Sequence, residues 1–137
     1  MDKGEYKITL DEENNIVRVV ALGVLDKKLG EELITNARTI AGKHNYQILC
    51  DATKAAVKVS LADWYFLPRI LPVLKNTNLR AIRAAVLIPS GEQEKIYSFY
   101  ETVTHNVGMD LRVFLKEEEA INWLKESGKI KNAIPQK

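Results

Sequence analysis

Four short apolar runs are separated from one another by longer segments with helical periodicity. The runs are IVRVVAL at 16–22, YQILCD at 46–51, IRAAVLI at 82–88 and DLRVFL at 110–115. Runs of this length and composition are typical of buried strands. Strands that are separated by helices pair in parallel through right-handed crossovers. The alternation therefore predicts a mostly parallel sheet that is covered by helices.

A shorter alternating segment precedes the first run. Tyr6, Ile8 and Leu10 alternate with polar residues, as in a strand with one buried face. The sequence DEENN at 11–15 follows, and such residues bond their own backbone in turns. We therefore expect a β-hairpin whose first strand runs antiparallel at or near an edge of the sheet.

Capping residues followed by apolar periodicity predict four helices. The expected caps or first residues are Asp26, Ser60, Ser90 and Glu117. Gly42 and Gly128 are the expected ends of the first and last helices. Pro68 and Pro72 should kink or break the second helix, because proline lacks the backbone N–H and clashes with the preceding turn.

These elements predict an α/β fold. It consists of a mixed five-stranded, mostly parallel sheet with four helices, in the order ββαβαβαβα. The length of 137 residues suits one domain, which we place at 1–128, with a loose C-terminal tail at 129–137. The nearly continuous apolar strands favour a sheet covered by helices, with one face less covered than the other.

Charge and cysteine content exclude several classes of protein. The 20 basic and 18 acidic residues give a net charge of +2, which is too balanced to indicate binding to nucleic acid. Cys50 is the single cysteine, so an internal disulfide and a cysteine-based zinc site are excluded. The opening MDKGEYK lacks the apolar centre of a signal peptide, and no apolar run approaches the ~20 residues of a membrane helix. We expect a soluble cytoplasmic protein that is not integral to a membrane.

The motifs of common cofactor sites and enzymes are missing from the sequence. Only Gly23 follows the run at 16–22, whereas a dinucleotide-binding fold needs several glycines there. No P-loop pattern is present. Six positions after Cys50 stands Ala56, where a cysteine phosphatase has arginine. No acid, base and nucleophile converge in the pattern, so we expect no metal, no cofactor and no enzymatic activity.

The stretch ILCDATKAAVKVSLADW at 48–64 holds the first candidate site residues. Asp51 and Thr53 follow a predicted strand, and Ser60 precedes a predicted helix. Open α/β sheets bind at the carboxyl ends of their strands. Asp51 could be a phosphoacceptor, as in receiver domains, but a receiver has two crossovers before that residue and this chain has one. We favour a role in which Asp51 orients the following segment by bonding backbone amides.

A second candidate turn is IPSGEQE at 88–94. Ser90 and Gln93 have the spacing of a capping box. Free amides at the start of that helix could bind an anion, and an ordinary N-cap is the favoured alternative.

Three segments carry a resemblance to a known family. They are GVLDKKLGEEL at 23–33, ILCDATKA at 48–55 and VFLKEEEAINWL at 113–124. They look like the turn into the first helix, the strand ending in Asp, and the last strand and helix of the STAS or SpoIIAA-like superfamily, first known from bacterial anti-sigma-factor antagonists. The resemblance covers about residues 5–126. It implies a non-enzymatic domain that acts through protein–protein contact.

The resemblance also makes Ser60 a candidate phosphosite. In the phosphoswitch branch, a Ser or Thr in an Asp-Ser-Ser/Thr-Gly turn starts the second helix, and its phosphorylation adds about two negative charges that break partner docking. Ser60 stands at that place, although no Asp precedes it and no Gly follows it. A plain N-cap is the alternative. The chain looks more like the diverged SpoIIAA-like branch, and lipid-binding relatives keep a ligand in view.

The segment LADWYFLPRILPVL at 61–74 remains to be explained. Helical residues advance by about 100° each, so Trp64, Tyr65 and Phe66 spread over about 200°. One apolar stripe hides only part of that arc. At least one of these rings should face a partner, a groove or solvent.

Two functions stay open from the sequence. The first is a STAS-like regulatory or scaffolding domain that binds a protein partner or a second copy of itself through the 52–72 surface. The residues expected there or beside it are Asp51, Thr53, Ser60, Trp64, Tyr65 and Phe66. The second is a carrier or sensor of a small apolar or lipid-like ligand, held between the 60–75 helix and the sheet, which requires a cavity at that place.

Overall fold

The computed structural model of the chain describes residues 3–89 and 94–133. Its strands are β1 (Glu5–Asp11), β2 (Ile16–Asp26), β3 (Gln47–Lys58), β4 (Ala84–Leu87) and β5 (Leu111–Phe114). Its main helices are α1 (Lys27–His44), α2 (Leu61–Ile70), α4 (Glu94–His105) and α5 (Glu117–Ala133). The 3₁₀ helix η1 (Pro72–Lys75) and the short helix α3 (Thr77–Arg80) follow α2. The predicted order is therefore present, with two short elements added.

The break predicted at Pro72 is confirmed, whereas α2 continues through Pro68. α2 ends at Ile70, and Leu71 is extended, with φ −75° and ψ 119°. Pro72 then opens η1. A proline at this position cannot donate the backbone hydrogen bond that would continue α2, and the residue before a proline is biased toward extended backbone. The chain therefore turns here, and α3 packs against the C-terminal end of α1.

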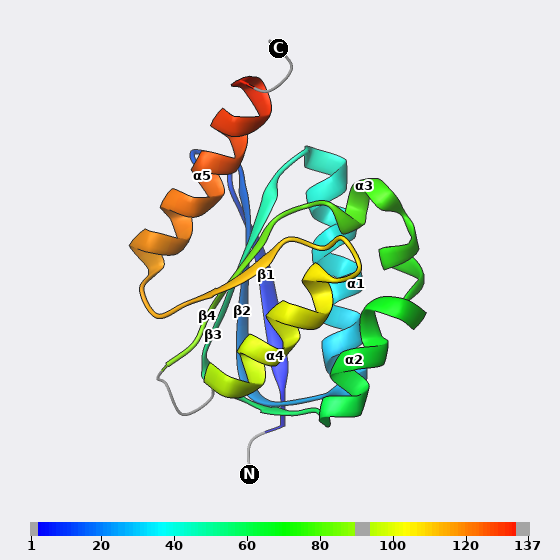
Figure 1. The fold of residues 1–137 in the computed structure, drawn as a ribbon. Helices are drawn as coiled ribbons and strands as arrows, with labels where there is room; N and C mark the ends of the chain where they lie inside the picture. Colours follow the sequence, from blue (N-terminus) through cyan, green and yellow to red (C-terminus); the bar gives the residue numbers. More distant parts are fainter. Residues whose placement is uncertain (1–2, 90–93, 134–137) are drawn as a thin grey trace.

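The five strands form one sheet in the order β1-β2-β3-β4-β5 (Figure 1). β1 pairs antiparallel with β2, and the remaining neighbours pair in parallel. Spatial order follows sequence order, because each crossover joins adjacent strands. The mixed, mostly parallel sheet with β1 at an edge is thus as predicted.

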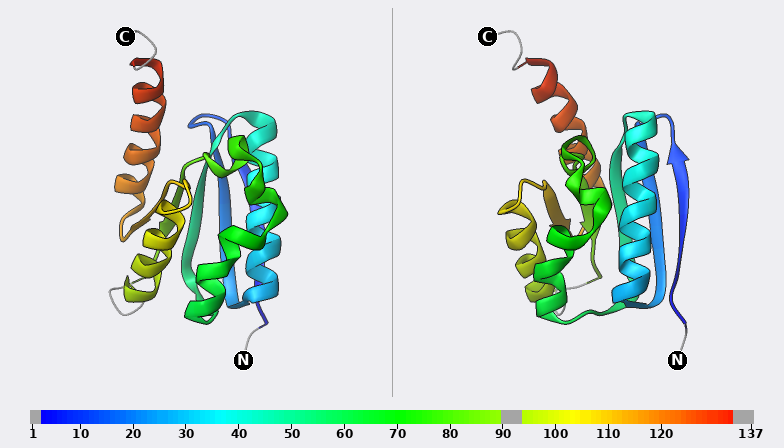
Figure 2. Two further views of the ribbon diagram at one scale, coloured as in Figure 1. Left: turned by 45° about the vertical axis from the view of Figure 1, so that its right-hand side comes forward. Right: turned by 90° about the vertical axis from the view of Figure 1, so that its right-hand side faces the viewer.

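Helices cover both faces of the sheet. Right-handed crossovers between sequential neighbours place their helices on one face, so α1, α2 and α4 lie together over a core that includes Val17 and Ile48. α5 follows the last strand and completes no crossover. It lies on the other face, where Trp123 packs in a second core with Leu49. In the right-hand view of Figure 2, α1, α2 and α4 lie in front of the sheet and α5 behind it.

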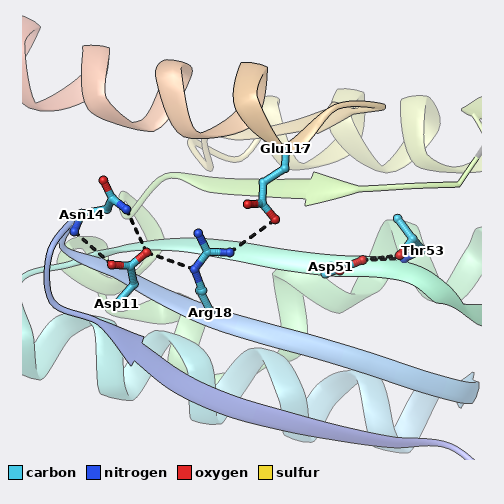
Figure 3. A network of polar contacts seen from close by, with 6 residues as sticks. All are labelled: Asp11, Asn14, Arg18, Asp51, Thr53 and Glu117. Carbon is cyan, nitrogen blue, oxygen red and sulfur yellow. Dashed lines mark hydrogen bonds and ion pairs between the residues drawn. The ribbon is translucent and has the colours of Figure 1, made fainter.

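The face that carries α5 is less covered than the other, as predicted. α5 packs on β3, β4 and β5, and Val20 of β2 remains 36% exposed. A polar network ties the start of α5 to the hairpin (Figure 3). Arg18 Nη1 lies 3.4 Å from Glu117 Oε1, and Arg18 Nε donates to Asp11 Oδ2 at 3.0 Å. Asp11 also accepts from the backbone and side chain of Asn14, which closes the predicted turn.

Two predicted helix ends are wrong. α1 passes Gly42 and ends at His44, with Asn45 in the left-handed conformation at φ 60°. A Cβ on Gly42 would collide with the side chain of Leu79, so this glycine allows α3 to approach α1. α5 passes Gly128 and continues to Ala133, since a single glycine lowers helix propensity without breaking the helix. The loose tail from 129 remains a prediction for 134–137, which lie outside the described residues.

The second and third strands are longer than predicted. β2 continues to Asp26 and β3 to Lys58, beyond the expected ends at Leu22 and Asp51. β4 pairs with β3 only from Ile48 to Asp51. The continuous apolar run in β3 therefore ends where the strand loses one neighbour, and the strand goes on beside β2 alone.

A β-bulge lies where this change occurs. The register of β2 and β3 shifts between Val20 and Leu22, so Ala21 lies opposite both Ala52 and Thr53. A bulge leaves the extra residue without a ladder partner. Asp51 Oδ1 supplies one, because it accepts from the Thr53 backbone N–H at 2.9 Å and from Thr53 Oγ1 at 2.6 Å (Figure 3). Asp51 bonds a backbone amide as expected, but inside a strand.

Replacing Asp51 should destabilise the fold through this bulge. Asp51→Ala leaves the Thr53 N–H without its acceptor, and we expect the free energy of unfolding to fall by about 1 kcal/mol, the lower part of the usual range because the site is partly exposed. Asp51→Asn keeps an acceptor oxygen and should lose less. Urea unfolding of both variants measures the difference, and equal losses would contradict this role.

Candidate functional site

The predicted site residues lie on two different faces of the sheet. Asp51 and Thr53 point toward the face of α5 (Figure 3). Their neighbours Cys50 and Ala52 belong to the core on the opposite face, because side chains alternate along a strand. Trp64 of α2 packs in that same core. The six residues therefore do not form one surface, and the sequence-based grouping is wrong in this respect.

Ser60 is the N-cap of α2. Its backbone is extended, with φ −68° and ψ 158°, and its Oγ accepts from the Asp63 backbone N–H at 3.1 Å. The capping role predicted from the sequence is confirmed. Ser60 is exposed, so it is also open to modification, and its phosphorylation remains a prediction.

The three aromatic residues of α2 divide between the inside and the outside. Trp64 is only 8% exposed and its ring centroid lies 4.0 Å from that of Tyr100. Tyr65 is 41% and Phe66 52% exposed. Trp64 thus belongs to the core and is removed from the predicted surface, whereas the expectation that at least one ring faces outward is confirmed. The reason is the helical phase, which turns position 64 toward the sheet together with Leu67.

The outer side of α2 carries a cluster of exposed apolar residues. It consists of Leu61 (54% exposed), Tyr65, Phe66 and Ile70 (50% exposed), and we name it the α2 patch. Tyr65 and Phe66 meet edge to face, with ring centroids 5.1 Å apart. The Arg69 guanidinium lies 3.9 Å from the Tyr65 ring centroid and donates to the Tyr65 carbonyl at 2.6 Å. The two rings of the patch are therefore in contact, and one cation lies over the Tyr65 ring.

An apolar pocket lies on the inner side of the same helix. It measures about 100 Å³ and lies between α1, α2, α4 and the sheet. Its walls include Leu33 of α1, Trp64 and Leu67 of α2, Tyr100 of α4 and Cys50 of β3. The cavity that a ligand carrier requires is thus present.

Buried side chains with polar atoms, among them Arg38 and Trp64, border this pocket. Arg38 is 3% exposed, and its Nη1 donates to the carbonyls of Leu79 at 2.8 Å and Ile82 at 2.9 Å. Desolvation lowers the pKa of Arg38. Trp64 Nε1 is buried and has no hydrogen-bond partner within the described residues. Arg38 is held by backbone, whereas Trp64 keeps one unused donor.

The thiol of Cys50 is not set up as a nucleophile. Burial, followed by the negative charge of Asp51, raises the pKa of Cys50 from 9.0 to about 12. Cys50 keeps some accessible area, but it lines the pocket, so that area faces apolar side chains. Burial also raises the pKa of Tyr100 to about 12. The prediction of a small core cysteine agrees with this environment.

The second candidate turn cannot be placed. Ser90 and Gln93 lie outside the described residues, and α4 is described from Glu94. In residues 3–89 and 94–133, no three His, Cys, Asp or Glu side chains are grouped so that they could hold a metal ion. No helix in this part of the chain combines the length and apolar content needed to span a bilayer.

Comparison with solved structures shows the fold. The chain is similar to an uncharacterised protein of the DUF3478 family with a SpoIIAA-like fold from Shewanella loihica PV-4, at 20% identity and a TM-score of 0.56, over 88% of this chain and 93% of that one. It is also similar to the anti-sigma factor antagonist SpoIIAA in its unphosphorylated form, at 16% identity and a TM-score of 0.51, over 88% and 98%. The chain has a SpoIIAA-like fold. No family model and no curated protein sequence matches it.

The SpoIIAA-like fold confirms the resemblance found in the sequence. It also gives α2 a defined place, between β3 and β4 in the chain and on the face opposite α5. The α2 patch and the pocket are therefore two sides of one helix in this fold. Asp51 and Thr53 lie apart from both, on the α5 face (Figure 3).

The cap at Ser60 predicts a specific stability pattern. Ser60→Ala removes the acceptor for the Asp63 N–H, so the free energy of unfolding should fall by about 1 kcal/mol. Ser60→Asp keeps a capping oxygen and adds a negative charge at the positive end of the helix dipole, so it should stay close to the parent protein. Thermal and urea unfolding measure this, and a larger loss for Ser60→Asp than for Ser60→Ala would contradict the cap.

The environment of Cys50 predicts that its thiol is alkylated slowly and that its ionisation makes the stability of the fold depend strongly on pH. Only the thiolate reacts, so iodoacetamide at pH 8 should alkylate the native protein much more slowly than the urea-unfolded protein. Because the pKa of Cys50 is raised from 9.0 to about 12, only the unfolded state ionises between these values, and stability should fall as pH rises through that range. Cys50→Ala should lose this part of the pH dependence. Equal alkylation rates in the two states would exclude the buried thiol.

Proposed function

We propose that the chain is a non-enzymatic regulatory or scaffolding domain, which binds a protein partner or a second copy of itself through the α2 patch. The observation that carries this proposal is the exposure of four large apolar side chains on one short helix. Contiguous exposed apolar residues mark interaction sites on small domains. One solved structure with a similar fold is an anti-sigma factor antagonist, a name that describes action on another protein. We place this activity in the cytoplasm.

The chemistry of the α2 patch suits a protein interface. Tyr, Phe and Arg are enriched at the centres of such interfaces, and Tyr65, Phe66 and Arg69 supply all three. The Arg69 side chain already lies over the Tyr65 ring, so little side-chain entropy would be lost when a partner covers it. The proposed partner therefore presents an apolar surface with an acceptor or carboxylate opposite Arg69.

Ser60 gives this interface a means of regulation. It caps α2 one residue before Leu61 of the patch. A phosphate there would add about two negative charges beside an apolar contact, which weakens docking by desolvation of the charge. Asp51 and Thr53 lie on the other face of the sheet (Figure 3) and take no part in this contact.

The α2 patch can be tested by photo-crosslinking. A photoreactive amino acid in place of Ala62, which is exposed within the patch, should capture one defined protein or a second copy of the chain in cells. Phe66→Asp should abolish the crosslink, because a buried carboxylate at the contact is strongly unfavourable. Leu115→Asp is the matched control, since Leu115 is 56% exposed and lies outside α2.

The folded state of each variant must be checked by circular dichroism, and the assembly state by analytical ultracentrifugation. Trp64 is unsuitable for this test, because it is buried and its replacement would unfold the core. A crosslink that survives Phe66→Asp and disappears in Leu115→Asp would refute the α2 patch as the interface.

A second candidate function is the carrier or sensor of a small apolar ligand. The pocket of about 100 Å³ under α2 favours it. The two candidates are compatible, because they use opposite sides of the same helix.

A further inference from the structure

We propose that the pocket binds a compact, neutral and apolar molecule about the size of one aromatic ring. This inference rests on the second candidate function and names its ligand class. It is independent of the α2 patch. Three observations carry it, namely the volume of the pocket, the chemistry of its walls and an opening in α1.

The volume sets the size of the ligand. The pocket holds about 100 Å³, and an engineered apolar cavity of about 150 Å³ takes up benzene. A single ring, or an aliphatic group of similar bulk, is therefore the largest compact molecule that fits without movement of the helices. A long acyl chain is too large, which separates this site from a lipid carrier.

The walls set its polarity. Leu33, Ile48, Leu67, Ala84 and Val86 present carbon atoms to the pocket. Two charged residues, Arg38 and Asp26, also line the pocket. Arg38 Nη1 is already bonded to two backbone carbonyls, and the Asp26 carboxylate accepts from the Leu29 backbone N–H. A carboxylate or ammonium ion would enter this site at a large desolvation cost. The ligand is therefore neutral.

The pocket offers a ligand almost no polar partner. The Nε1–H of Trp64 is buried without a partner in the described part of the chain, but this atom has almost no accessible surface, so a ligand in the pocket does not reach it. A plain hydrocarbon ring therefore suits the pocket at least as well as a ring with a hydroxyl group.

Gly30 gives the ligand a way in. It lies within α1 and lines the pocket near the carboxyl ends of β2 and β3, where Leu25, Val57 and Val59 also line it. A Cβ at Gly30 would meet no atom within 4 Å, so packing does not require a glycine here. A glycine within a helix costs stability relative to alanine. Because Gly30 has no side chain, the wall of the pocket is open at this position.

The test uses benzene, phenol and dodecanoate as probes of the full-length protein. Benzene and phenol should raise the melting temperature in a concentration-dependent manner. They should also slow the modification of Cys50 by methyl methanethiosulfonate, by about tenfold at ten times the probe Kd, because Cys50 lines the pocket and only the free protein reacts. Dodecanoate should do neither.

Variants locate the site. Gly30→Leu should fill the opening and abolish both effects without loss of folding, because leucine is a good helix former. Lys28→Leu is the matched control on the exposed part of α1 and should bind as the parent does.

Each other outcome overturns the inference. The site is excluded if benzene and phenol, each at its solubility limit in the buffer, neither shift the melting temperature nor protect Cys50. Unchanged binding in Gly30→Leu would place the ligand elsewhere, and preferential binding of dodecanoate would refute the size limit. Phe66→Asp leaves the pocket intact and should still bind benzene, so failure of the α2 patch as an interface is distinguished from failure of the pocket.

Discussion

The pairing of β2 with β3 beyond the end of β4 is the constraint on which the rest of the structure depends. β3 loses β4 as a neighbour after Asp51 but stays paired with β2 to Lys58. The bulge at Ala52 and Thr53 adjusts the register at this step, and the Asp51 carboxylate satisfies the amide that the bulge releases. The sheet is therefore wide at one end. At the other end it consists of β2 and β3, with β1 beside β2. α2 follows directly after this end of β3, and the pocket under α2 is lined by residues of β3 and of β4.

This geometry explains why a pocket and an exposed patch occur on one helix. Trp64 and Leu67 reach down toward β3 and meet α4 through Tyr100, but they do not fill the space beside Val57 and Val59. α2 ends shortly before Pro72 and has 10 residues, so it offers few positions to divide between core and surface. Bulky residues at successive positions then leave Phe66 outside when Trp64 is inside. Occupancy of the pocket would stiffen α2, and a stiffer α2 presents its outer side at lower entropic cost.

Much of the fold could be predicted because its signals are local. The order of elements follows from apolar periodicity, and the helix starts at Asp26 and Ser60 follow from side chains that cap their own helices. The end of β3 could not be predicted from the end of its apolar run. Such a run shows where a strand is buried between two neighbouring strands, and the strand can continue beyond that point. The candidate site was harder to predict than the fold. Three consecutive aromatic residues do not reveal which one faces the sheet, and the pocket is made by α1, α2 and α4, which come together only in the fold.

The two glycines within α1 show why a residue type alone does not determine a role. Gly42 gives room to the end of the Leu79 side chain, which a Cβ at this position would displace, and it does not end the helix. Gly30 is required by no contact and lies beside the pocket. In the sequence both are single glycines in a helical pattern. Only the space around each Cβ position separates a glycine that brings two helices together from one that leaves a wall open, and that space is set by residues far away in the chain.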